Sequence, residues 1–89
     1  MTLELFGMAR ALVGAASVEL TVSEPATLRG LLGALAARYP QLAGSVLDAA
    51  SHAPLEPNVV LLDGRRARGL DEPVSDLDRP CLLFLPSGG

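Results

Sequence analysis

Apolar and polar positions alternate where the chain begins. In residues 2–6, leucines alternate with Thr2 and Glu4, and the same period of two returns over 17–22. Because successive side chains of a strand point to opposite faces, both segments are predicted to be half-buried strands of a hairpin. The small residues between them, 7–16, predict a long connection with room for a single helical turn.

A helical period follows Thr27, which is a good N-cap residue. Apolar side chains then recur at intervals of three and four positions, at Leu28, Leu31, Leu32, Leu35, Ala36 and Tyr39. This spacing predicts an amphipathic helix over 28–39. Pro40 is expected to end it, because the residue before a proline is disfavoured in the helical conformation. Beyond it, 41–50 predicts a second short helix whose inward side chains are Leu42, Val46 and Leu47.

A hairpin is predicted in the second half of the chain. Residues 58–62 are mostly apolar and predict a strand, and Asp63-Gly64 directly after it is the strongest short hairpin signal in the sequence. The return strand over 65–70 is expected to be short and exposed. Its charged side chains, which suit the edge of a sheet, are Arg65, Arg66 and Arg68.

The last apolar run, 81–85, shows no alternation. Such a run is typical of a strand buried on both faces in the middle of a sheet. With the strand over 2–6 parallel beside it and the helix over 28–39 across one face, the predicted fold is α+β. It is a ubiquitin-like β-grasp with a mixed sheet of four to five strands and one main helix. The β-grasp domain is predicted to cover 1–85, and 86–89 to form a flexible C-terminal Gly-Gly tail.

Composition narrows the class of protein. A chain of 89 residues makes one domain, and with 3% aromatic residues its core must consist mainly of Leu, Val and Ala. The net charge of −3 gives no basic surface for nucleic acid, and no stretch is long and apolar enough for a membrane span. The single cysteine excludes an internal disulfide framework. No secretory leader is recognisable, so we expect a cytoplasmic protein. All seven basic residues are arginine.

The residues that could carry chemistry are few. Cys81 begins an apolar run and is predicted to pack as a small hydrophobe, although a redox or persulfide-handling thiol is the alternative. His52 is expected in a loop without a second metal ligand. Asp76 and Asp78 are predicted to form a turn rather than an acid–base pair or a cation site. The arginines of the predicted edge could instead have a functional role, in which they contact phosphate or an acidic partner. Because one Cys, one His and no Lys supply no nucleophile with its base, the chain is not expected to be an enzyme, and no metal site is predicted.

Three stretches together resemble a known family. They are "LELFGMARALVG" at 3–14, "TLRGLLGALAARYPQL" at 27–42 and the terminal "FLPSGG" at 84–89. The sequence is similar to the ubiquitin-like sulfur carriers of the ThiS/MoaD family, most of all to the small subunit of molybdopterin synthase. The terminal Gly-Gly is the most specific of the three features.

The resemblance implies a function for the C-terminus. The carboxylate of Gly89 would be adenylated with ATP by a ubiquitin-activating-like partner enzyme of the MoeB/ThiF kind. A sulfur donor such as a cysteine desulfurase or a rhodanese would then convert it to a thiocarboxylate. The chain would bind no permanent cofactor itself. It would donate the sulfur in molybdenum cofactor biosynthesis, as the small subunit beside the molybdopterin synthase large subunit.

The same resemblance assigns roles to the residues before Gly89. Gly88, Ser87 and Pro86 would enter the partner's narrow channel, where glycine leaves room and proline stiffens the exit from the strand. Docking on the partner is predicted from the last strand itself, because its side chains on a face that the helix leaves uncovered would join an exposed apolar patch. The residues predicted for it are Phe84, Leu83 and Leu85. Many members have a longer segment before Gly-Gly, whereas here only Ser87 follows the proline, and three residues reach about 10 Å at most.

Other functions stay open at this point. Within the family, carriers also serve the biosynthesis of cysteine, thiamine or secondary metabolites. A ubiquitin-like protein modifier would instead join Gly89 to lysines of its targets. A plain interaction domain with an accidental Gly-Gly ending is the third class.

Overall fold

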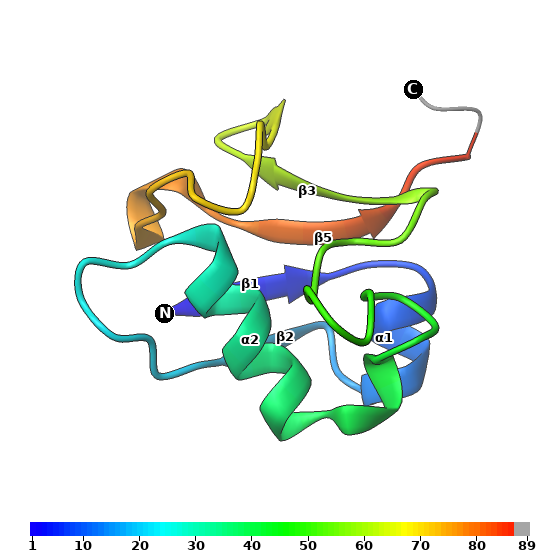
Figure 1. Ribbon diagram of the computed structural model, residues 1–89. Coiled ribbons are helices and arrows are strands. Elements are labelled where there is room, and N and C mark those ends of the chain that lie inside the picture. Colours follow the sequence, from blue (N-terminus) through cyan, green and yellow to red (C-terminus); the bar gives the residue numbers. More distant parts are fainter. Residues whose placement is uncertain (87–89) are drawn as a thin grey trace.

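The computed structural model describes residues 1–86, and within them five strands form one mixed sheet (Figure 1). In chain order they are β1 (Thr2–Leu5), β2 (Ser17–Glu19), β3 (Asn58–Leu62), β4 (Arg65–Arg66) and β5 (Cys81–Phe84). The order across the sheet is β2-β1-β5-β3-β4, with β5 parallel to β1 and antiparallel to β3. The predicted β-grasp, with parallel terminal strands at its centre, is confirmed.

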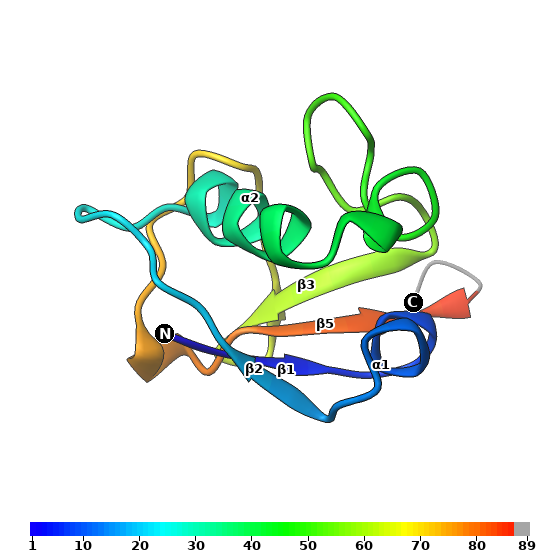
Figure 2. The same ribbon diagram turned by 90° about the horizontal axis from the view of Figure 1, so that it is seen from below.

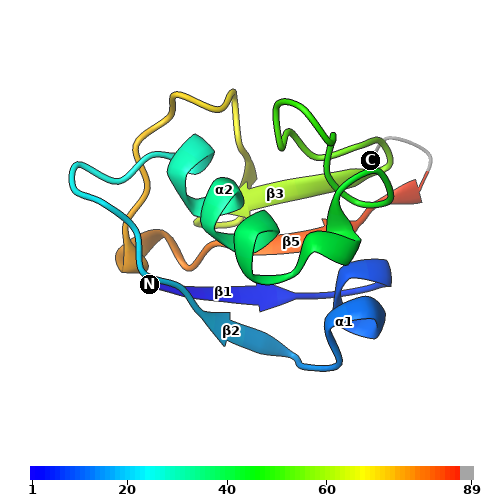
Figure 3. The same ribbon diagram turned by 60° about the horizontal axis from the view of Figure 1, so that its bottom comes forward.

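The core lies between one face of the sheet and helix α2 (Leu28–Arg38), as Figures 2 and 3 show. In β1 and β2 the side chains on this face alternate with exposed ones. The buried set across the sheet includes Leu3, Leu5, Val18, Val60, Leu62 and Leu82. The apolar stripe of α2 meets them through Leu28, Leu31, Leu32, Leu35 and Ala36. The apolar periods of two in the strands and 3.6 in the helix therefore predicted which side chains of the sheet and of α2 form the core.

The ends of α2 follow the predicted signals. The hydroxyl oxygen of Thr27 accepts a hydrogen bond from the Gly30 N–H at 3.2 Å, which satisfies one of the free donors of the first turn. The helix ends at Arg38, one residue earlier than predicted, and Pro40 begins a short 3₁₀ helix, η1 (Pro40–Leu42). A second 3₁₀ helix, η2 (Asp76–Asp78), precedes β5.

Several connections differ from the sequence-based expectation. The segment between β1 and β2 contains a full short helix, α1 (Met8–Val13), rather than a single turn. The second helix over 41–50 was a wrong prediction: the chain instead turns at Gly44, whose φ is 87° and whose N–H donates to the Leu47 carbonyl at 2.6 Å. The prediction that three side chains of this segment point into the core is confirmed, since Leu42, Val46 and Leu47 are fully buried. The strands predicted over 17–22 and 65–70 are both shorter.

The expectation that β5 is buried on both faces is also wrong. Leu82 is fully buried, but Cys81 and Leu83 are half-buried and Phe84 is 41% exposed. The reason is that α2 covers one face of the sheet only, and no helix of residues 1–86 crosses the other, the open face (Figure 2). The apolar side chains of β5 outside the core therefore need another explanation. In the same residues, no helix is long and apolar enough to span a membrane.

Candidate functional site

The C-terminal segment leaves the sheet at the end where α1 lies (Figures 1 and 2). One residue beyond β5, the Leu85 N–H donates to the Pro57 carbonyl at 2.8 Å, so the chain is still held against the residue that precedes β3. Pro86 is the last residue described. The predicted tail residues Ser87, Gly88 and Gly89 lie outside the described part of the chain. We call the region around Leu85 and Pro86 the tail exit.

Phe84 packs beside the turn between β1 and α1. A Cβ added to Gly7 would lie 2.8 Å from the Phe84 Cβ, so only a glycine leaves room for this approach. Gly7 also has φ 68° and precedes α1 as its N-cap residue. The Phe6 N–H donates to the Leu82 carbonyl at 2.9 Å. These contacts hold α1 against the end of β5 and place Phe84 at the tail exit with 41% of its surface exposed.

The open face carries an apolar patch next to the tail exit. Leu5 pairs with Leu82 in parallel register, so Phe6 and Leu83, one residue further on, lie beside each other on the opposite face. Cys81 and its antiparallel partner Leu61 continue the patch. We call Phe6, Leu61, Cys81 and Leu83 the open-face patch. Adjacent apolar side chains on an uncovered sheet face are typical of a protein docking surface.

A second apolar surface belongs to α1. Met8 and Leu12 are 45% and 41% exposed and lie one turn apart on the same side of the helix. With Phe6 and Phe84 they make four of the five large hydrophobic residues that are exposed in residues 1–86. All four therefore gather at the end of the molecule where the tail leaves. The fifth, Leu77, lies in η2 at the start of β1, the far end of the sheet (Figure 1).

The three residues predicted from the sequence for partner docking lie in or next to these surfaces. Leu83 lies in the open-face patch, Phe84 is exposed at the tail exit and Leu85 is half-buried next to it. Phe6 and the exposed side of α1 were not predicted from the sequence. A signal for Phe6 was present, because it occupies the side of the alternation that otherwise carries Thr2 and Glu4.

The lone cysteine and histidine gain no partners that suggest catalysis. Cys81 is half-buried on the open face rather than in the core, and burial is the main cause that raises the pKa of its thiol. The reactive thiolate is therefore disfavoured at neutral pH. His52 stands in a loop with φ 64°, near Gly33 of α2. In residues 1–86, no group of three His, Cys, Asp or Glu side chains could hold a metal ion.

Asp76 and Asp78 form the turn that the sequence predicted. The Asp78 carboxylate accepts the Ser75 N–H at 2.9 Å, within a capping box at the start of η2. Asp76 accepts the N–H of Thr2 at 2.9 Å and so ties η2 to the first residue of β1. Both carboxylates therefore accept hydrogen bonds from backbone N–H groups that help to hold the fold together.

Two arginine side chains near β4, those of Arg65 and Arg66, are paired with acidic residues of the same chain. The Arg66 guanidinium lies 2.8 Å from a Glu56 carboxylate oxygen. Arg65 pairs with Glu72, whose carboxylate also accepts the backbone N–H of Arg68 at 2.7 Å. Chiefly because of the Arg65 hydrogen bond, the pKa of Glu72 falls from 4.5 to about 2. These contacts support a structural role for this edge.

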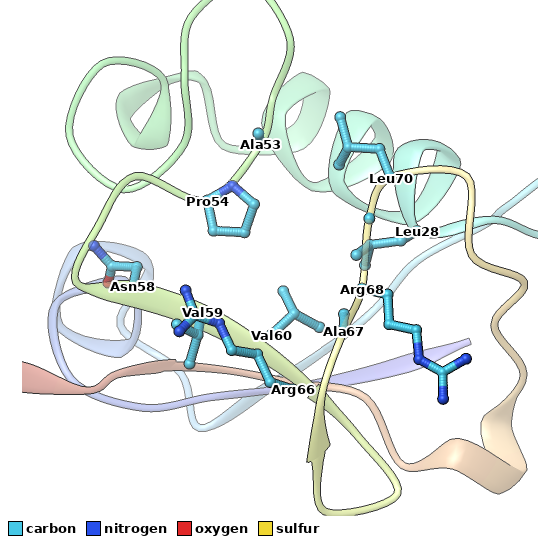
Figure 4. A pocket seen from close by; sticks show the side chains of 11 residues that line it. Leu28, Ala53, Pro54, Asn58, Val59, Val60, Arg66, Ala67, Arg68 and Leu70 are labelled. Carbon is cyan, nitrogen blue, oxygen red and sulfur yellow. The ribbon is translucent and has the colours of Figure 1, made fainter. Parts of the chain in front are cut away.

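A pocket of about 180 Å³ lies between β3, the start of α2 and the segment after β4 (Figure 4). Its walls are both apolar and polar, with Leu28 and Leu70 on one side and Val60 on the other, and Arg66 and Arg68 stand beside it. It is smaller than the pockets that usually hold small-molecule ligands. The apolar surfaces around the tail exit are therefore the better candidate for the functional site.

Comparison with known proteins gives a family and a set of structural relatives. The model of the ThiS family matches residues 3–89. The crystal structure of SAMP1 from Haloferax volcanii is similar, with 28% identity, a TM-score of 0.80, and coverage of 100% of this chain and 98% of that one. A crystal structure of H. volcanii small archaeal modifier protein 1 matches with 26% identity, a TM-score of 0.78 and 93% coverage of both chains. The solution structure of the H. volcanii HVO 2177 protein has 30% identity and a TM-score of 0.62, and the match covers 99% of this chain and 87% of that one. No curated protein matches.

Proposed function

Because the chain belongs to the ThiS family, we propose that it is a sulfur carrier whose reacting group is the α-carboxylate of Gly89. It is a ubiquitin-like β-grasp protein, and the proposed reacting group, a C-terminal carboxylate, is a substrate that another enzyme must activate. The chemistry is therefore assigned to partner enzymes, and the chain serves as their protein cosubstrate.

The proposed reaction has three steps. A carboxylate oxygen of Gly89 attacks the α-phosphorus of ATP on an adenylating enzyme, which forms the acyl-adenylate and releases pyrophosphate. The terminal sulfur of a persulfide on a desulfurase or rhodanese partner then attacks the acyl carbon, and AMP leaves. A thiol reduces the S–S bond of the resulting acyl disulfide, and that thiol and the partner's sulfur are left joined as a disulfide. The product is a thiocarboxylate, whose sulfur passes to an acceptor on a second partner.

The observation that carries the proposal is the place where the chain leaves the sheet. Leu85 is held by the Pro57 carbonyl, and Gly89 is four residues further along the sequence. Four extended residues span about 14 Å. The partner's nucleotide must come within that distance of the tail exit, and the partner must therefore contact its surroundings. The exposed side chains found there are Phe6, Met8, Leu12 and Phe84.

For the acceptor we propose molybdopterin, with the molybdopterin synthase large subunit as the second partner. The support is the likeness of the opening stretch, the helix and the tail to that small subunit. Cysteine, thiamine or secondary-metabolite biosynthesis is the alternative within the same chemistry. Binding to the large subunit, measured by calorimetry, distinguishes the molybdopterin pathway from these alternatives. A chain that is thiocarboxylated, fails to bind that subunit and is consumed by a cysteine-forming or thiazole-forming enzyme would refute the molybdopterin assignment and retain the carrier function.

A second candidate function is protein modification. It is favoured by the 28% identity and the TM-score of 0.80 to SAMP1 and by the name of small archaeal modifier protein 1. The activation step is then the same, but an amine of a target protein attacks the acyl carbon and an amide forms. Both candidates need Gly89 to be adenylated.

Exchange of radiolabel between pyrophosphate and ATP tests this shared step. With the cognate adenylating enzyme, exchange should depend on the chain and should vanish when Gly89 is deleted, because the new terminus ends about 3.5 Å short of the nucleotide. Gly89→Ala is the matched control for reach, since it keeps the length and adds one methyl group. Exchange that proceeds equally well without Gly89 would contradict the proposal.

A further inference from the structure

This sequence contains very few primary amines. Its 89 residues include no lysine, and the seven basic side chains are all arginine. Guanidinium groups stay protonated in proteins and are poor nucleophiles toward acyl groups. The α-amine of Met1 is therefore the one primary amine of this sequence.

The structure places that amine in a hydrogen-bonded pair. The Met1 nitrogen donates to the Leu20 carbonyl at 2.8 Å, and the Leu20 N–H donates back to the Met1 carbonyl at 2.8 Å. The pair extends the ladder between β1 and β2 by one rung. The Met1 side chain is 8% exposed and packs against the core, which fixes the position of the nitrogen.

A carboxylate completes the surroundings of the amine. Glu19 Oε2 lies 3.4 Å from the Met1 nitrogen. The pKa of Glu19 is lowered first by its hydrogen bond from the Thr2 hydroxyl and then by the one from the amine, so this carboxylate is ionised at neutral pH. An ammonium group that donates to a carbonyl and faces a carboxylate must lose a proton and leave both partners before its lone pair can attack.

Loss of the first methionine would not release a free amine. The α-nitrogen would then be that of Thr2, which lies 2.9 Å from Asp76 Oδ1. The nitrogens of Met1 and Thr2 therefore each contact an acidic residue.

From these contacts we propose that the chain is a donor-only carrier: its activated C-terminus acylates other molecules but not a second copy of itself. The inference rests on the proposed function, since it concerns the activated Gly89. Self-acylation would require an amine to attack the acyl carbon, with formation of a C–N bond, departure of AMP and loss of one proton from nitrogen. Within residues 1–89, the amine that could take this step is that of Met1, and it is engaged by Leu20 and Glu19. Activated copies are therefore preserved for sulfur transfer, and an acceptor protein receives single copies rather than chains.

The test uses a chemically prepared C-terminal thioester of the full chain, so that it does not depend on any activating enzyme. The thioester is mixed with an excess of the unmodified chain and with glycine amide, a small free α-amine, at slightly alkaline pH. Amide products are quantified by intact mass and located by peptide mapping. Glycine amide should be acylated, and the Met1 amine should react at least about tenfold more slowly, the factor that one charge-assisted hydrogen bond accounts for.

Two variants of the acceptor chain make the result specific. Arg68→Lys places one exposed amine on the surface and should become conjugated at residue 68. A Gly-Gly extension before Met1 moves the α-amine into solvent and should react as fast as glycine amide. The proposal is overturned if the parent Met1 amine reacts as fast as glycine amide. It is also overturned if the extended chain reacts as slowly as the parent, because engagement of the amine would then not be the cause. Failure of adenylation in the exchange assay would refute the proposed function without altering this result.

Discussion

The backbone of Gly7 occupies the space directly beside the Cβ of Phe84, so that any side chain at position 7 would collide with the end of β5. This contact joins the first connection of the chain to its last strand. It also places α1 beside the tail exit (Figure 3). The position of the proposed docking surfaces depends on it.

Gly7→Ala should therefore be costly. The alanine would have to adopt φ 68° and would stand 2.8 Å from the Phe84 Cβ. We expect a loss of about 2–5 kcal/mol in the free energy of unfolding, from backbone strain and overpacking together. Gly14→Ala is the matched control, because Gly14 has φ 82° but nothing within 4 Å of an added Cβ, and it should lose about 1–2 kcal/mol. Equal losses in urea denaturation would show that the Phe84 contact contributes nothing.

Truncation of Leu82 and truncation of Phe84 should lower the free energy of unfolding by clearly different amounts. Leu82→Ala removes a fully buried side chain and should cost about 2–5 kcal/mol. Phe84→Ala removes a side chain that is 41% exposed and should cost clearly less. Urea denaturation measures both. A larger loss for Phe84 would mean that it belongs to the core and is not available for docking.

Much of the fold could be predicted because its signals are local. The alternation around Leu3 and Leu5, the leucine stripe after Thr27 and the Asp63-Gly64 turn each specify one element with its buried side. Assembly into a β-grasp then followed from the apolar last strand. That step reached the right sheet order although its premise, burial of β5 on both faces, was wrong.

The missed features depend on tertiary contacts. No side chain caps α1, whose N-cap is Gly7, so the sequence contains no start signal for it. Residues 43–57 pack Val46 and Leu47 into the core from a loop held by scattered backbone hydrogen bonds, which produce no regular period. The apolar residues of the candidate site look like core residues in the sequence. Only the position of α2 on one face of the sheet shows that Leu83 is left outside it.

The open-face patch can be tested against an equally apolar residue elsewhere. Leu83→Asp should weaken binding to the adenylating enzyme by about tenfold or more, because it places a charge in the middle of the proposed contact. Leu77→Asp should leave binding unchanged, since Leu77 is 89% exposed at the far end of the sheet. Calorimetry gives both affinities, and thermal unfolding confirms that both variants fold. Equal weakening by the two variants would refute the assignment of this face.

Acid should destabilise the protein partly through Glu72. Its pKa is about 2 in the folded chain against an ordinary value of 4.5, chiefly because Arg65 donates to its carboxylate. A lowered pKa stabilises the folded state above pH 4.5, and this contribution is lost as the pH falls toward 2. Glu72→Gln should thus flatten the decline of stability in that range, as measured by urea denaturation at several pH values. Asp71→Asn, which removes an exposed partner of Arg29, is the control. An unchanged acid profile in Glu72→Gln would contradict the prediction.

The central claim is that the Gly89 carboxylate becomes a thiocarboxylate, and the intact mass of the protein tests it most directly. The chain is incubated with its adenylating enzyme, ATP and a sulfur donor, beside a variant that lacks Gly89. We predict that the full chain gains the mass of one oxygen-to-sulfur exchange, located at residue 89 by fragmentation, and that the shortened chain does not. No mass change in the full chain, with an enzyme that is active on another carrier, would contradict the claim.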